Sequence, residues 1–84
     1  MIINRKLFFQ ARNEFLQSFA DELNRCRRIK KIPLKKVAAD SVHIKADYID
    51  KIELNAQKTY PSLNTLIYVA LACDQKITVK LEDF

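Results

Sequence analysis

Residues 37–53, VAADSVHIKADYIDKIE, decide how this chain folds. Val37 and Ala38 are the inward apolar residues of a first short helix. Ile49 and Ile52 are three residues apart, which places both on one face of a second short helix. The residues between the two helices are polar with two apolar anchors, which is typical of a turn. The stretch therefore predicts two short helices joined by a turn, and the second helix has a polar outer face that suits a partner's groove.

This stretch and its continuation resemble the helix-turn-helix of the phage Cro/C1-type (Xre-type) repressors. Residues 49–53, IDKIE, are similar to the family's I-S-x-I-E ending, and residues 60–66, YPSLNTL, are similar to its P-S-L-x-T-L motif. Arg27 stands six residues before Pro33, where the family carries an arginine in its first helix. The likeness covers about residues 23–79. It implies an all-α, five-helix lambda-repressor-like domain that binds double-stranded DNA and needs no cofactor.

The resemblance also implies which side chains read the DNA. The family contacts base edges and the flanking backbone from positions that are here Lys45, Ala46, Asp47, Asp50 and Lys51. Lysine can donate to guanine O6 and N7, and aspartate can accept from cytosine N4. Phosphate repels carboxylates, so Asp47 and Asp50 have three interpretations: they read cytosine, they favour the positive end of the helix dipole, or they mark a surface that does not bind DNA.

Phosphate contacts are expected on both sides of the two short helices. Residues 24–36 contain seven basic side chains and no acid, which favours a cationic surface for phosphate over a merely solvated helix face. The candidate phosphate-binding residues are Lys35, Lys36, Asn55, Gln57 and Lys58. Asn55 stands where the family has Gly or Asn after its helix, and asparagine tolerates the left-handed cap.

Two further positions follow from the family pattern. Its first-helix arginine typically pairs with the glutamate that ends the recognition helix, which implies a structural ion pair between Arg27 and Glu53 rather than DNA contacts.

The chain also departs from the family pattern at two places. Leu34 replaces a glutamine that often touches phosphate, and the two-helix stretch is one residue longer than the family spacing, with Val42 or His43 as the insertion.

Composition limits the chain to one small domain. Its 84 residues are 49% hydrophobic and 30% charged, with a net charge of +5, which indicates a folded basic globule. A chain of this length buries only about 60% of its unfolded surface, so a dimer or a partner would add stability. Glycine is absent, which excludes Gly-rich phosphate loops and leaves Asn, Asp or Lys for tight turns with positive φ.

Other function classes find little support in the sequence. His43 is the only histidine and no acid or cysteine cluster has ligand spacing, so neither an enzyme nor a metal site is expected. Cys26 and Cys73 do not make a disulfide framework and are expected to be small buried hydrophobes in a reducing cytosol. No apolar run approaches the ~20 residues of a membrane span. We therefore expect a cytoplasmic, nucleoid-associated protein.

The predicted helices outside this stretch rest on apolar periodicity. A helix over about residues 5–16 carries apolar side chains that either complete the core or form a dimer or partner surface: Leu7, Phe8, Ala11, Phe15 and Leu16. Ser18 is expected to cap the next helix, and the sequence does not decide whether the two are continuous. Ser62 is expected to cap a last helix, which closes the core with Leu63, Leu66, Ile67, Ala70 and Leu71 on Phe19, Leu23, Val37, Ile49 and Ile52.

The C-terminal residues 76–81, KITVKL, alternate between apolar and polar side chains. Ile77, Val79 and Leu81 share one face, which predicts a strand. A strand in an otherwise helical chain lacks an internal mate, so we expect it to pair with a second copy about a twofold axis. A last helix followed by a short loop and a terminal strand resembles the small antitoxins of the HipB kind, in which such a strand joins the subunits.

These expectations define three segments: a helical extension over 1–17, a helix-turn-helix DNA-binding domain over 18–75 and a dimerisation tail over 76–84. The expected function is a sequence-specific transcriptional regulator, a repressor of antitoxin or phage type, that binds a palindromic operator as a homodimer. The alternative is a protein-interaction module on the same scaffold that binds a toxin or another regulator. Asp47, Asp50 and Leu34 favour the alternative, and the basic run opposes it.

Overall fold

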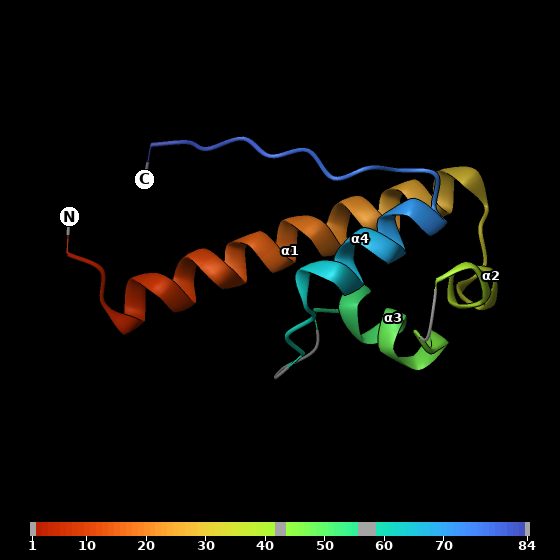
Figure 1. The fold of residues 1–84 in the computed structure, drawn as a ribbon, viewed down its shortest axis with the longest axis horizontal. Helices are drawn as coiled ribbons and strands as arrows, with labels where there is room; N and C mark the ends of the chain where they lie inside the picture. The colour runs from red at the N-terminus through yellow and green to blue at the C-terminus, as the bar shows by residue number, and fades with distance from the viewer. Residues whose placement is uncertain (1, 42–43, 56–58, 84) are drawn as a thin grey trace.

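The computed structural model describes residues 2–41, 44–55 and 59–83 (Figure 1). These residues form four helices and no strand: α1 (Arg5–Lys30), α2 (Leu34–Asp40), α3 (Ala46–Glu53) and α4 (Leu63–Ala72). The all-α class is confirmed, whereas the expected count of five helices is wrong for the described chain. Among these helices, none combines the length and the apolar character that a membrane crossing needs.

The missing helix is explained by α1, which joins the two helices expected over 5–16 and 18–30. Ser18 is therefore an exposed residue inside a helix and does not cap one. The cap is Asn4, whose side-chain oxygen accepts a 2.9 Å hydrogen bond from the Leu7 N–H. No Gly or Pro interrupts α1, and serine tolerates a helical interior at small cost, so the local cap signal at Ser18 is overridden.

The core lies where all four helices meet, at the C-terminal half of α1. Its central cluster takes at least one residue from every helix or its end: Leu23, Val37, Ile49, Ile52, Val69 and Cys73. The expected core positions Leu23, Val37, Ile49 and Ile52 are confirmed. Burial of each large aliphatic side chain contributes about 1.5–3 kcal/mol. The N-terminal half of α1 extends beyond this cluster (Figure 1).

The inward face of α4 differs from the expected one. Leu66 and Ala70 are buried as expected, but Val69 and Cys73 complete the face. The side chains of Leu63, Ile67 and Leu71 are instead 65%, 39% and 57% exposed. The helix reads LNTLIYVALA and is apolar on most sides, so its periodicity does not single out one face. Its start was predicted correctly, because the Ser62 Oγ accepts a 3.2 Å hydrogen bond from the Thr65 N–H.

The C-terminal tail is extended but forms no β-ladder with any described residue, so the expected strand is not present within the chain. A ladder requires a second strand, and the rest of the described chain is helical or irregular. The tail runs back beside α1 towards its N-terminal half, on the side away from α3 (Figure 1). Ile77 is half-buried there, whereas Val79 and Leu81 are 83% and 92% exposed.

Left-handed turns form without glycine, as expected. The three described residues with positive φ are Lys31 at 56°, Asn55 at 48° and Asp74 at 58°. Lys31 ends α1 and donates its backbone N–H to the carbonyls of Arg27 and Arg28. Asn55 follows α3 and Asp74 follows α4, so the helix-ending turns after α1, α3 and α4 each use one of the residue types predicted for this conformation.

Candidate nucleic-acid interface

An ion pair attaches the end of α3 to α1. The Arg27 Nε donates to Glu53 Oε1 at 2.5 Å, and its Nη2 donates to Glu53 Oε2 at 2.9 Å. The same carboxylate accepts a 3.3 Å hydrogen bond from Asn24 Nδ2. Arg27 Nη1 also donates to the Ile32 carbonyl at 3.1 Å, just before α2. One guanidinium therefore connects α1, the approach to α2 and the end of α3.

The ion pair is largely withdrawn from water. The Glu53 side chain is 3% exposed and that of Arg27 is 18% exposed. The hydrogen bonds to Glu53 raise the pKa of the Arg27 guanidinium against the opposing effect of burial. Removing one partner of such a pair strands a buried charge and costs about 3–5 kcal/mol. Both side chains are occupied inside the protein, so they orient α3 and are not free to bind a ligand.

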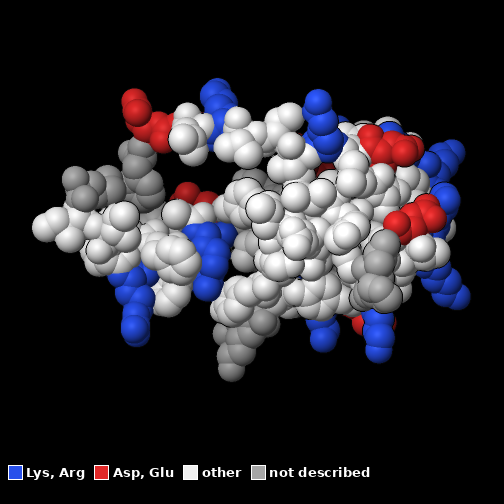
Figure 2. Space-filling view, in the orientation of Figure 1, with Lys and Arg blue, Asp and Glu red and all other residues white. Residues whose placement is uncertain are grey.

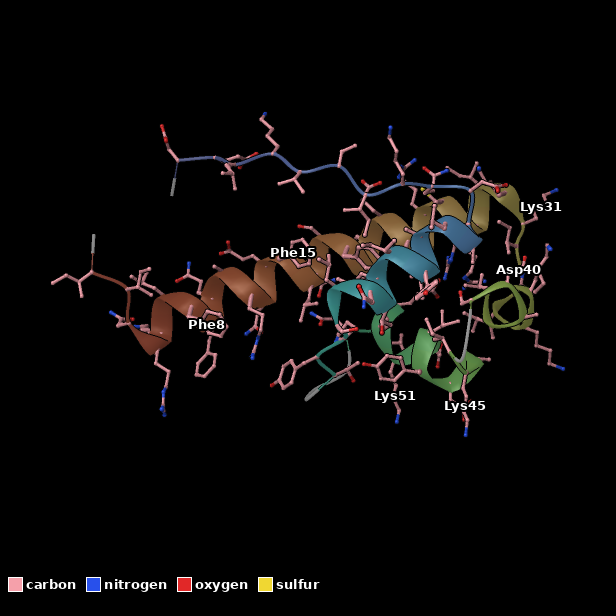
Figure 3. All side chains as sticks on the ribbon, viewed as in Figure 1. Phe8, Phe15, Lys31, Asp40, Lys45 and Lys51 are labelled. Carbon is pink, nitrogen blue, oxygen red and sulfur yellow. The ribbon has the colours of Figure 1, made fainter. Side chains whose placement is uncertain are left out.

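The outer face of α3 presents charged side chains of both signs. Lys45, Asp47, Asp50 and Lys51 are exposed, and Ala46 is half-buried. Lys45 is the residue that precedes α3, and it projects with Lys51 on the side of the molecule away from the tail (Figure 3). With Ile49 and Ile52 buried on the inner side, α3 offers a short polar surface on a rigid support.

The two aspartates of α3 have different surroundings. Asp47 lies in the first turn, where a carboxylate is favoured by the positive end of the helix dipole. Asp50 lies one turn further on, and its charge contributes to the raised pKa of Arg27. Each carboxylate therefore has a favourable electrostatic neighbour within the protein. That reduces, without removing, the repulsion that a nearby phosphate would experience.

The basic run over 24–36 is partly neutralised by acids of the same chain. Figure 2 shows acidic side chains among the basic ones at this end of the molecule. Among the described residues, four of the seven basic side chains lie within 4.0 Å of a carboxylate: Arg25 with Glu22, Arg27 with Glu53, Lys30 with Asp74 and Lys36 with Asp40. Glu22 and Asp40 flank the run on the helices of their basic partners, whereas the fold brings Glu53 and Asp74 to it from distant parts of the chain.

The predicted phosphate-binding residues do not behave as one group. Lys35 and Lys36 are exposed on α2, and the Lys36 Nζ lies 3.0 Å from the Asp40 carboxylate. Asn55 is half-buried, and its side-chain amide donates to the Gln17 Oε1 of α1 at 3.1 Å. Gln57 and Lys58 lie outside the described residues, as does His43. Among the predicted phosphate-binding residues that the structure describes, Lys35 is therefore the one without a polar side-chain partner.

Sequence reasoning missed a cation–aromatic cluster near the start of α1. The Arg12 guanidinium lies 4.0 Å from the ring centre of Tyr60, 4.9 Å from that of Phe9 and 5.7 Å from that of Phe8. Tyr60 belongs to the segment between α3 and α4. Arg12 lies one helical turn before the buried Leu16, and this spacing is the feature of the sequence that could have indicated an inward-facing Arg12. The contact with Tyr60 arises only from the tertiary structure.

The remaining reactive groups do not form a centre. No group of three His, Cys, Asp or Glu side chains that could hold a metal ion occurs among the described residues. Cys73 is fully buried and Cys26 is half-buried, and both are free thiols. Burial raises the pKa of the Cys73 thiol above its ordinary value. The thiol of Cys73 is therefore protonated and unreactive at neutral pH.

No protein-family model, curated protein or solved structure matches this chain. The placement of α3 and the charges around it are therefore the basis for assigning a function.

Proposed function

We propose that the chain is a sequence-specific DNA-binding transcriptional regulator of the Cro/C1 (Xre) type that binds a palindromic operator as a homodimer. The observation that carries this proposal is the way in which α3 is held. Ile49, Ile52 and the Arg27–Glu53 ion pair fix its inner side, and Lys45 and Lys51 project from its outer side. A rigidly supported short helix with outward donors is suited to the major groove.

In the proposed complex α3 is the recognition helix. Lys45 and Lys51 donate to guanine O6 and N7 or to flanking phosphates, and Ala46 contacts the edge of a base pair. Asp47 and Asp50 accept from cytosine N4, which requires cytosine opposite them and disfavours other bases by repulsion. Lys35 and Lys36 on α2 supply phosphate contacts, so binding weakens as salt rises.

A homodimer is supported by the state of the tail. Val79 and Leu81 are exposed, and the extended backbone around them has no ladder partner among the described residues. Unpaired extended segments with an apolar face pair readily with another copy. Antiparallel pairing of two tails about a twofold axis would present two α3 helices to half-sites about 34–36 Å apart.

A second candidate function is a protein-interaction module that holds a toxin or another regulator. It is favoured by the exposed apolar side chains Phe15, Leu63 and Leu71, which the fold leaves uncovered. It is also favoured by a groove of ≈ 350 Å³ between α1 and the first residues of the tail. An antitoxin would combine both functions, with α3 for the operator and this apolar side for the toxin.

The proposal is tested by a fluorescence-anisotropy titration of the DNA upstream of the protein's own coding region, at two salt concentrations and with competitor DNA. Replacing Lys45 and Lys51 by Ala together is expected to weaken specific binding by about tenfold to a hundredfold. Replacing Lys76 and Lys80 by Ala removes the same charge from the tail and should have little effect. Equal weak binding to every duplex, or equal losses in the two variants, would overturn operator recognition by α3.

A further inference from the structure

Arg12 is a cation that the fold holds in place without an acidic partner. Its guanidinium lies 4.0 Å from the Tyr60 ring centre and is flanked by Phe8 and Phe9. The Arg12 Nε is buried and makes no hydrogen bond within the described chain. No carboxylate of the described residues lies within ion-pair distance of Arg12. The aromatic rings therefore fix the position of a positive charge that nothing described in the chain neutralises.

Packing alone does not account for an arginine at this position. Arg12 lies four residues before Leu16, so it continues the buried stripe of Leu16, Ala20 and Leu23 towards the free end of α1. A leucine or methionine would cover the same rings without bringing a charge to them. Guanidinium tolerates such a site because it is weakly hydrated and stacks on aromatic faces, and it keeps its in-plane N–H donors available when it does so.

The cluster also lies on the side of the molecule that carries the outer face of α3. Phe8, whose ring is in contact with Arg12, points from α1 towards the side on which Lys45 and Lys51 project (Figure 3). Basic side chains from the N-terminal half of α1 and from the α2–α3 region meet the same lower edge of the molecule (Figure 2). The tail lies on the opposite side of α1 (Figure 1).

We propose that Arg12, stacked on Tyr60, binds a DNA backbone phosphate in the flank of the site that α3 reads. The inference rests on the proposed operator binding and extends it to a second contact region. The stacked face of the guanidinium is occupied by the ring. Its Nη atoms make no hydrogen bond to any described residue, so they can form the two parallel hydrogen bonds that arginine makes to phosphate. Tyr60 acts as a positioning residue, because it holds the guanidinium plane and does not touch the phosphate.

The length of α1 limits how far this contact lies from α3. Arg12 stands 15 residues before Arg27, which is paired with the last residue of α3. At about 1.5 Å per residue the two arginines are about 22 Å apart along the helix axis. Since base pairs are spaced by about 3.4 Å, the phosphate lies at most about six base pairs beyond the end of α3. The contact is therefore lost when the flanks of the operator are shortened.

The experiment combines protein variants with two duplexes: a specifically bound upstream fragment that keeps about six base pairs of flank beyond each half-site, and the same fragment without those flanks. Arg12→Met removes the charge and keeps an apolar stem against the rings. Tyr60→Phe keeps the ring. Lys80→Met is the control, since Lys80 is an exposed residue of the tail, which lies on the opposite side of α1.

Arg12→Met is expected to weaken binding to the long duplex by about tenfold. The slope of log K against log salt should fall in magnitude by about 0.9, the value for one lost phosphate contact. On the shortened duplex Arg12→Met should bind like the unmodified protein. Lys80→Met and Tyr60→Phe should bind like the unmodified protein on both duplexes. Circular dichroism melting checks that each variant is folded.

Four results would overturn the proposal. An unchanged salt slope with equal losses on both duplexes would make Arg12 purely structural. An equal effect of Lys80→Met would show that the loss comes from the net charge of the protein and not from a contact of Arg12. If the unmodified protein binds specifically and Arg12→Met equals it on the long duplex, Arg12 makes no contact while operator recognition stands. If the unmodified protein binds no duplex specifically, both the operator function and the Arg12 contact are wrong.

Discussion

The two halves of α1 use the same helical face in different surroundings. In the C-terminal half, residues 18–30, Leu23 belongs to the central core cluster, Ala20 is buried, and Arg27 is paired with a buried carboxylate. In the N-terminal half, Phe8 and Phe15 are 53% and 50% exposed. Arg12 on that half meets aromatic rings in place of an acid. The comparison teaches that apolar periodicity specifies the helix, whereas the burial of its side chains depends on which other segments of the chain pack against it.

The largest expected effect comes from breaking the ion pair of the buried half. Glu53→Ala strands the Arg27 guanidinium and should lower the free energy of unfolding by about 3–5 kcal/mol, measured by urea denaturation. Arg25→Ala is the control, because the Arg25–Glu22 pair is exposed on the same helix and should contribute little to stability. Similar small losses in both variants would show that the buried pair does not hold α3.

A second prediction compares apolar side chains from the two halves. Leu23→Ala removes a core side chain and should cost about 2–5 kcal/mol of unfolding free energy. Phe15→Ala removes a larger but half-exposed ring and should cost less than about 1.5 kcal/mol in the same urea experiment. A loss for Phe15→Ala as large as that for Leu23→Ala would mean that a second molecule covers the N-terminal half in solution.

A third prediction concerns the tail that runs beside α1. Deletion of residues 76–84 should convert dimers to monomers in sedimentation velocity, because it removes the backbone that we expect to pair between copies. The helical content should be unchanged, since Ile77 is the half-buried apolar residue of this segment and the central core cluster contains none of its described residues. The Lys76→Ala and Lys80→Ala double variant keeps the tail and should stay dimeric. An unchanged dimer after the deletion would exclude the tail as the joint.

The smallest expected effect is a pH dependence of the unfolding free energy that comes from the buried thiol of Cys73. Burial raises the pKa of the Cys73 thiol, so the folded state holds its proton more tightly than the unfolded chain. This contribution to stability is complete below the unfolded pKa of about 8.5 and is lost as pH rises towards the folded pKa. The unfolding free energy should therefore fall as pH rises from about 8 to 9.5. Cys73→Ala should remove this slope, and Cys26→Ala should keep it.

Much of the local structure was predictable because its causes lie within one or two helical turns. The Ser62 cap, the burial of Ile49 and Ile52 and the left-handed turns at Asn, Asp or Lys depend on neighbouring residues, and all are confirmed. The Arg27–Glu53 pairing rested on resemblance, since nothing in the spacing of two residues so far apart requires it. The candidate base-reading and phosphate-binding roles stay predictions until DNA binding is measured.

The sequence-based predictions that the structure corrects have a common physical origin in contacts between distant residues. Ser18 has the chemistry of a cap, but Leu16 and Ala20 on either side of it are buried, and α1 continues through this position. On α4, both possible faces are apolar, and the positions of α1 and α2 decide that Val69 faces inward while Leu71 does not. Pairing of the tail with a second copy stays a prediction, since the strand pattern was expected to have no mate within the chain and no described residue forms a ladder with it.

The sequence by itself determined the all-α class, the position of the two short helices, the caps that begin α4 and the residue types at the left-handed turns. These follow from hydrophobic period and from hydrogen bonds that reach three or four residues. Only the tertiary structure decided that α1 is continuous, which side of α4 is buried, that Lys30 meets Asp74 and that Arg12 meets Tyr60. Those outcomes depend on which surfaces compete for burial and on which distant residues come together. No short stretch of the sequence determines either of these.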